Sequence, residues 1–204
     1  LDEVRTLAVR ALTFRDEPLP GARAYSEVPF GGSPPKSGAA LPWGSATPVQ
    51  IPGADFRIAG YIDRLDIAAD GRRVRVCDYK TGARPKTDII LNGGQELQRC
   101  LYGFAVRALL GTEVEVDASL LYLRDETRLK LPDPQAALDA MVGYLNAARA
   151  NLLAGVSTIG PDAGEEYDEF AFALPANAGA AYRQRKLAAA IERLGVAATV
   201  WEAP

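Results

Sequence analysis

Apolar and polar residues alternate through two segments, residues 60–66 and 74–82, that flank an Asp-Gly pair. Such alternation predicts two β-strands, and an Asp-Gly pair between them is typical of a β-hairpin. With Asp70 and Gly71 as the two central turn residues, the register places Asp63 directly opposite Asp78. Lys80 lies two residues beyond Asp78, so it is expected to project from the same face.

Longer segments show the period of an α-helix. Apolar residues three or four positions apart predict helices over residues 2–13, 95–110, 134–153 and 178–194. Apolar runs predict strands over residues 114–123 and 128–131, and the Gly-, Pro- and Ser-rich residues 31–49 predict a loop. This order favours an α/β fold, with a central mixed β-sheet flanked by helices, in a single domain over residues 1–204.

The hairpin carries the candidate chemistry. Like charges directly opposed on two strands are destabilising, and a divalent cation between Asp63 and Asp78 would remove that penalty. Mg²⁺ is typically held by one or two carboxylates and several waters. Lys80 could orient or deprotonate one of those waters, or stabilise developing negative charge. The alternative is a solvated hairpin surface, but residues 74–77 have the apolar character of a buried strand.

Charge and composition narrow the classes of function. A net charge of −3 argues against a bulk electrostatic DNA binder. Near the hairpin, however, five cations predict a local basic strip or a solvated face: Arg72, Arg73, Arg75, Arg84 and Lys86. The absence of histidine excludes histidine bases and triads. The acidic residues 165–169 are a weaker rival metal site, because no periodic pattern supports them.

The remaining features concern the setting of the chain. Cys77 and Cys100 predict buried, reduced thiols and a cytoplasmic protein rather than a disulfide framework. No apolar run approaches the roughly 20 residues of a membrane span, so no membrane partner is expected. A sequence that begins at Leu1 without methionine is expected to be a fragment of a longer protein.

Three blocks of sequence together resemble the PD-(D/E)XK nuclease superfamily and, within it, the RecB/AddB-type exonuclease domain. They are Gly60-x-Ile62-Asp63-Arg64-x-Asp66, Asp78-Tyr79-Lys80-Thr81-Gly82 and Glu96-Leu97-Gln98-x-x-x-Tyr102. The resemblance covers about residues 56–106, and residues 26–30 are weakly similar to the first strand of such domains. It implies a restriction-endonuclease-like core.

The resemblance also implies roles for individual residues. Asp63, Asp78 and the backbone carbonyl of Tyr79 would bind Mg²⁺ or Mn²⁺, and Lys80 would be the catalytic lysine. Gln98 and Tyr102 would hold DNA or the catalytic group. Two cations on the loop after the hairpin, Arg84 and Lys86, are further candidates for binding DNA.

The implied activity is metal-dependent hydrolysis of DNA, as an exonuclease in recombination and repair, with helicase domains or subunits of the parent protein as partners. The alternative is a catalytically inactive nuclease-like module that binds DNA or a protein. A different metal-dependent hydrolase is more remote, because the lysine and the Gln-x-x-x-Tyr block would then have no role.

The chain departs from the family pattern in two respects. Many RecB-type domains have a histidine ligand upstream of the first aspartate, whereas this chain has no histidine. Glu27 could substitute, or the ligand lies before residue 1. The two cysteines are too few for a four-thiolate cluster, so no iron–sulfur cluster is expected in this chain.

Overall fold

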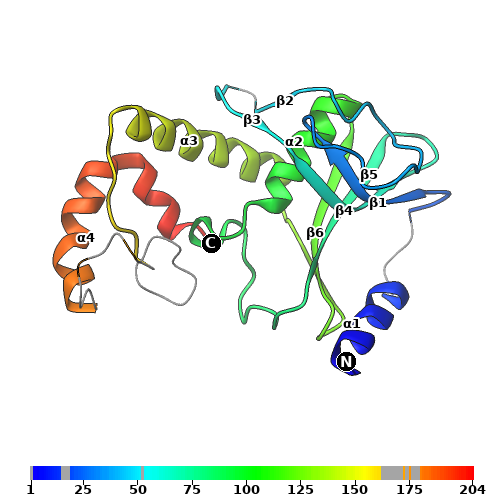
Figure 1. Ribbon diagram of the computed structural model, residues 1–204, viewed down its shortest axis with the longest axis horizontal. Coiled ribbons are helices and arrows are strands. Elements are labelled where there is room, and N and C mark those ends of the chain that lie inside the picture. The colour runs from blue at the N-terminus through cyan, green and yellow to red at the C-terminus, as the bar shows by residue number, and fades with distance from the viewer. Residues whose placement is uncertain (1, 15–18, 52, 162–171, 173–174, 176–179) are drawn as a thin grey trace.

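A five-stranded mixed sheet forms the centre of the molecule (Figure 1). The computed structural model describes residues 2–14, 19–51, 53–161, 172, 175 and 180–204. The strand order is β1-β4-β5-β6-β7, and all neighbours are antiparallel except the parallel pair β5 and β6. The strands are β1 (Arg23–Phe30), β4 (Gly60–Ile67), β5 (Arg73–Lys80), β6 (Glu115–Tyr122) and β7 (Thr127–Lys130). The predicted α/β fold is confirmed.

The residues predicted to form a loop, 31–49, run from β1 to a small second sheet. This sheet consists of β2 (Val49–Gln50) and β3 (Arg57–Ile58), which pair in antiparallel fashion. The loop is tied back to β1, because the Trp43 indole N–H donates a hydrogen bond to the carbonyl of Pro29 at 2.8 Å.

The hairpin of β4 and β5 has the predicted register. Arg64 pairs with Cys77, and Ile67 pairs with Val74. The turn is wider than the two-residue turn expected, because the N–H of Ala68 donates to the carbonyl of Arg73 at 2.9 Å and the intervening residues form the loop. Asp70 and Gly71 remain at its centre, so the wider turn leaves the strand register unchanged.

The sheet forks where regular pairing between β4 and β5 ends, at Arg64 and Cys77. Beyond this point β4 continues along β1 as far as the pair of Gly60 with Phe30. β5 instead continues along β6 as far as the pair of Lys80 with Tyr122. The two strands therefore part at Asp63 and Asp78.

Two helices cover one face of the sheet and enclose the main core (Figure 1). They are α2 (Gln98–Leu110), in the crossover between β5 and β6, and α3 (Pro134–Leu153). The core includes side chains from the sheet and both helices: Val28, Ile62, Leu65, Val74, Val76, Val116, Ala105, Val106, Leu138 and Met141.

The first turn of α2 begins three residues later than predicted. The preceding residues form the short 3-10 helix η1 (Asn92–Gly94), in which Gly93 has a φ of 65° and interrupts the helical path. At the other end the prediction is confirmed, since Gly111 caps α2 with a φ of 112°.

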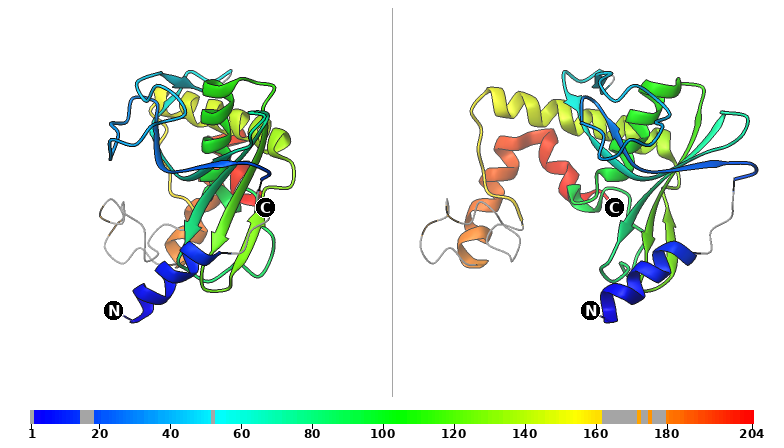
Figure 2. Two further views of the ribbon diagram at one scale, coloured as in Figure 1. Left: turned by 90° about the vertical axis from the view of Figure 1, so that its right-hand side faces the viewer. Right: turned by 45° about the vertical axis from the view of Figure 1, so that its right-hand side comes forward.

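The last elements lie away from the sheet, along the far part of α3 (Figures 1 and 2). They are α4 (Ala180–Leu194) and η3 (Gly195–Glu202). The predicted acidic metal site at residues 165–169 falls outside the described residues.

The predicted N-terminal helix is present as α1 (Asp2–Thr13), beside the turn between β6 and β7. Arg10 fixes it there by donating hydrogen bonds to the carbonyls of Leu123 and Arg124. Its apolar stripe does not join the core, and Leu12 is 88% exposed. None of the helices in the described ranges combines the length and apolar character that a bilayer span requires.

Candidate active site

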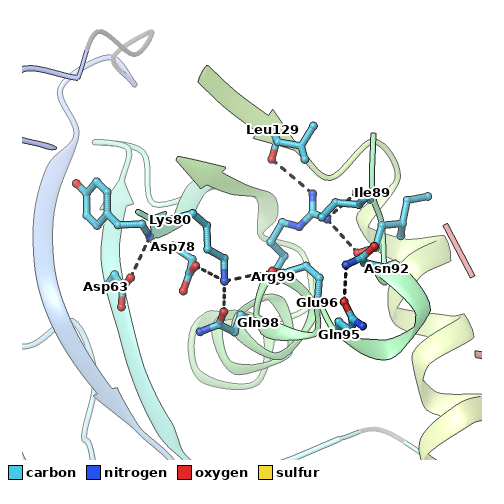
Figure 3. Close-up of polar contacts among 12 residues, drawn as sticks. Asp63, Asp78, Lys80, Ile89, Asn92, Gln95, Glu96, Gln98, Arg99 and Leu129 are labelled. Carbon is cyan, nitrogen blue, oxygen red and sulfur yellow. Dashed lines mark hydrogen bonds and ion pairs between the residues drawn. The ribbon is translucent and has the colours of Figure 1, made fainter. Parts of the chain in front are cut away.

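At the fork, the side chain of Asp63 takes the place of the backbone carbonyl that would accept a hydrogen bond from β5 in a continuous sheet. Its Oδ2 accepts a hydrogen bond from the backbone N–H of Tyr79 at 3.0 Å (Figure 3). A buried N–H group requires a partner, and the strand β4 no longer supplies one at this point. Asp63 therefore joins the two strands through its side chain. Its hydrogen-bond partner, Tyr79, directly follows Asp78 in β5.

Asp78 and Lys80 share the face of β5 that is directed toward α2, as the alternation predicted. The ammonium nitrogen of Lys80 lies 2.9 Å from Oδ2 of Asp78 and 3.2 Å from Oε2 of Glu96. It also donates a hydrogen bond to Oε1 of Gln98 (Figure 3). The lysine thus lies between strand and helix in contact with three side-chain oxygens.

Burial and charge shift the pKa values of these groups. Burial raises the pKa of Asp78 above its usual range, and the nearby Asp63 and Glu96 carboxylates raise it further against the lowering effect of Lys80. For Lys80, burial alone would lower the pKa, but contact with Asp78 and Glu96 outweighs it, so the pKa is raised. Lys80 is therefore a protonated ammonium at neutral pH.

The helix α2 brings Gln98 and Tyr102 to the site. Gln98 is its first residue, and Tyr102 follows one turn later, so the predicted i,i+4 pair faces the same neighbours. The Tyr102 ring packs edge-on against Phe30 of β1, with ring centroids 6.4 Å apart. Burial, followed by the charges of Asp78 and Asp63, raises the pKa of the Tyr102 hydroxyl, which therefore stays neutral.

Glu96 is a site residue whose role the sequence patterns did not predict. Only 6% of it is exposed, and it contacts Lys80 from the segment that precedes α2. The signal available in the sequence was its place in the block that contains Gln98 and Tyr102, but an acidic residue before a helix is commonly solvated. Its burial depends on the packing of α2 against the sheet.

The donor set fits a divalent cation. Asp63 and Asp78 offer carboxylates, and Oδ2 of Asp78 is buried and has no hydrogen bond, although it contacts Lys80. Tyr79, whose carbonyl is the third predicted ligand, belongs to β5, and its N–H donates to Asp63. Among the described residues, no group of three or more Asp, Glu, Cys and His side chains is close enough to hold a metal ion. Two carboxylates and one backbone carbonyl would leave the remaining positions around a divalent cation to water.

Glu27 lies beside the fork, but its carboxylate has another partner. The backbone at Glu27 has a φ of 50°, and regular pairing of β1 with β4 skips this residue. Its side chain is exposed and forms an ion pair with Lys36, whose ammonium also lies 4.2 Å from the centre of the Tyr61 ring. Metal binding by Glu27 stays a prediction, and it would require this ion pair to open.

The prediction that the five cations near the hairpin form one continuous basic strip is wrong. Arg75 is buried, with only 3% exposed. The exposed Arg72 precedes β5, whereas Arg84 and Lys86 follow its end, and an eight-residue strand spans about 25 Å. The loop with the exposed Arg84 and Lys86 lies at the turn between β6 and β7, because the N–H of Arg84 donates to Asp125 at 3.0 Å.

The two cysteines are buried free thiols, as predicted. Cys77 lies on β5 beside Asp78, with its side chain on the opposite face from that aspartate. Burial raises the pKa of Cys100 to about 11, so this thiol is protonated at neutral pH and unreactive as a nucleophile.

In a comparison with protein-family models, residues 5–195 match the PD-(D/E)XK nuclease superfamily. The match includes every strand of the central sheet and all residues that the fork brings together. Comparison with curated proteins and with solved structures gave no significant match.

Proposed function

The chain belongs to the PD-(D/E)XK nuclease superfamily, and from this premise we propose that it hydrolyses phosphodiester bonds in DNA with a divalent cation, Mg²⁺ or Mn²⁺. The observation that carries the proposal is the ammonium of Lys80, 2.9 Å from the buried carboxylate of Asp78 at the fork. This arrangement places a positive charge beside a buried carboxylate that could also bind a cation.

Each residue at the fork has a role in this proposal. Asp63 and Asp78, with the carbonyl of Tyr79, would hold the cation, and Asp63 is fixed by the Tyr79 N–H. When bound, a divalent cation supplies polarisation of the phosphate and a lowered pKa of a bound water. The Lys80 ammonium stabilises negative charge that develops on the phosphate, and Gln98 orients it.

The raised pKa of Lys80 favours one of its possible roles. A protonated ammonium can stabilise negative charge or orient a water by donating a hydrogen bond, but it cannot accept a proton. We therefore assign Lys80 an electrostatic and orienting role in this proposal.

The finer parts of the proposal concern the biological setting. The blocks around Asp63, Lys80 and Gln98 support a RecB/AddB-type exonuclease that acts in recombination and repair, as part of a larger protein with helicase domains or subunits. Lys86 and Arg84, on the loop after β5, would contact the phosphates of the DNA. A cytoplasmic location is consistent with the two free thiols.

One observation favours a second candidate, a nuclease-like module that binds DNA or a protein without cutting. The described residues contain no cluster of three metal-binding side chains. Binding of Mn²⁺ in isothermal titration calorimetry would separate the candidates. The nuclease requires heat of binding that is lost in Asp63→Ala, whereas the module requires none.

The direct test uses the purified chain, Mn²⁺ and end-labelled linear single-stranded DNA. We expect cleavage that EDTA abolishes and that Asp78→Asn and Lys80→Met each reduce by about 1000-fold or more. The matched controls are Asp139→Asn on α3 and Lys186→Met on α4, which change the same charges at exposed positions. Cleavage that survives either site variant would refute the assigned roles. A circular substrate of the same sequence reports the mode of attack, since an exonuclease leaves it intact.

A further inference from the structure

Glu96 is a buried carboxylate whose charge is compensated at the candidate active site. Its Oε2 lies 3.2 Å from the Lys80 ammonium, while its Oε1 is buried without a hydrogen-bond partner among the described residues. An unpaired ionised group is costly to bury, so the position is tolerable only with a cation nearby. Arg99 also attracts Glu96, while its guanidinium donates hydrogen bonds to the carbonyls of Ile89 and Ile90. Lys80 is the cation that contacts the Glu96 carboxylate directly.

The contacts of Lys80 match its bonding capacity. An ammonium group has three N–H donors. Three oxygens surround it, one each from Asp78, Glu96 and Gln98. A lysine side chain has four rotatable carbon–carbon bonds and loses substantial freedom when it is fixed, so each of these contacts restricts where the charge can lie.

Glu96 and Asp78 approach the ammonium from different elements. Figure 3 shows the Lys80 nitrogen between Asp78 on β5 and Glu96 before α2, with Asp63 beyond Asp78. In the proposed nuclease Asp78 also serves as a metal ligand, so a bound cation competes with Lys80 for its oxygens. Glu96 lies on the other side of Lys80 from Asp63 and does not face that competition.

We propose that Glu96 is the positioning residue of Lys80, whose charge holds the ammonium at the reacting phosphate when Asp78 is engaged by the cation. This inference rests on the proposed nuclease function. Gln98 supports the same ammonium with a neutral oxygen, but only Glu96 supplies a negative charge from the helix side.

The kinetic test is a double-mutant cycle on DNA cleavage with Mn²⁺. Glu96→Gln keeps the shape of the side chain and an acceptor oxygen but removes the charge. We expect it to lower kcat by about 10- to 100-fold while KM for DNA stays unchanged, because the loss is one of positioning. In a Lys80→Met background the same substitution should cause no further loss. The control is Glu113→Gln, an exposed glutamate with the same change in charge.

The binding and stability tests do not depend on cleavage. Glu96→Gln should leave the calorimetric affinity for Mn²⁺ within about threefold of the unmodified value, since Glu96 is not a ligand. Glu96→Gln should be more favourable to Tm, by about 2 °C or more, in the Lys80→Met background than in the unmodified chain, because there the buried carboxylate has already lost the cation that contacts it. In the unmodified chain the same substitution should not raise Tm.

The outcomes separate this proposal from the proposed function. An unchanged kcat in Glu96→Gln, an equal loss of kcat in both backgrounds, or equal changes of Tm in both backgrounds would overturn the role of Glu96. Loss of Mn²⁺ affinity in Glu96→Gln would make it a ligand instead, which also overturns the proposal. If the unmodified chain does not cut DNA, the nuclease function is refuted, and with it the kinetic role of Glu96. The comparison of Tm values in the two backgrounds still tests whether Glu96 interacts with Lys80.

Discussion

The carboxylate of Asp63 binds the backbone N–H of Tyr79 at 3.0 Å, at the point where β4 and β5 separate (Figure 3). The contact uses Oδ2 of Asp63 and fixes the orientation of that carboxylate. It also gives the Tyr79 N–H an acceptor, which the backbone of β4 no longer provides. One side chain thus closes the fork in the sheet, and in the proposed nuclease its second oxygen, Oδ1, would bind the cation.

Replacement of Asp63 should separate its structural contribution from its chemical one. Asp63→Ala leaves the Tyr79 N–H without its acceptor, and we expect it to lower the free energy of unfolding by about 1–2 kcal/mol. Asp63→Asn keeps an oxygen acceptor and should cost less, yet it should abolish cleavage as completely as Asp63→Ala does. Urea denaturation and the cleavage assay measure the two effects. Equal stability of the two variants would contradict the role of the hydrogen bond.

Lys86 should contribute to DNA binding through a phosphate contact. In a cleavage-deficient Asp78→Asn background, Lys86→Ala should weaken binding and reduce the slope of log K against log salt concentration by about 1. Fluorescence anisotropy at several salt concentrations gives this slope. Arg72→Ala is the matched control, because Arg72 is exposed at the other end of β5. The same change of slope in both variants would indicate general charge attraction rather than a contact by this loop.

A comparison of Gly31 with Gly32 separates the effect of a close backbone contact from the effect of a positive φ. Both have positive φ, 66° and 100°, but a Cβ on Gly31 would lie 2.0 Å from the carbonyl oxygen of Ile58, whereas one on Gly32 meets open space. We expect Gly32→Ala to cost about 1–2 kcal/mol from the backbone conformation alone. Gly31→Ala should cost distinctly more, measured by urea denaturation. It should also reduce cleavage, since the neighbouring Phe30 packs against Tyr102.

Asp117 should give the protein part of its acid sensitivity. Burial alone would raise its pKa, but the ion pairs with Arg128 and Lys130 outweigh burial, so the pKa is lowered. The unfolded state therefore binds a proton more readily, and acid favours unfolding. The unmodified chain should exceed Asp117→Asn in free energy of unfolding by a constant amount above about pH 4. This difference should disappear as the pH falls through the lowered pKa.

Urea midpoints between pH 3 and pH 7 measure the effect of Asp117. Asp139→Asn, at an exposed position on α3, is the control and should show a much smaller change over the same range. A difference between the unmodified chain and Asp117→Asn that stays constant down to pH 3 would contradict the ion-pair account.

Local patterns predicted several elements accurately because the forces that define them act within a few residues. Asp70 and Gly71 at the centre of the turn led to the correct register of Arg64 with Cys77. The bounds of α3 were also correct, since Pro134 suits a first helical position and the Asp133 side chain accepts the Ala136 N–H at 3.0 Å.

The start of α2 shows where local patterns fail. Helical periodicity predicted a start at Gln95, but the residues before the helix are bound from a distant part of the chain. The N–H groups of Ile90 and Asn92 donate to the main-chain oxygen of Pro204 at 2.8 and 3.0 Å, and η1 forms instead of the first turn. A contact over this sequence separation leaves no periodic signal.

Spacing along the chain was enough to predict which residues share one face of β5 and which lie one helical turn apart. Period-two alternation placed Asp78 with Lys80, and the i,i+4 spacing placed Gln98 with Tyr102. The family match over residues 5–195 agrees with the resemblance of these blocks to the PD-(D/E)XK nuclease superfamily.

The point at which β4 and β5 separate, and the residues that α2 buries, depend on packing between distant segments. Beyond the pair of Arg64 and Cys77, β4 stays paired with β1 while β5 stays paired with β6, so the two strands separate. No property of the hairpin itself specifies these neighbours. The burial of Glu96 against Lys80 follows from the packing of α2 on the sheet. Such contacts join segments that are distant in the sequence, so the energy that fixes them is absent from any local pattern.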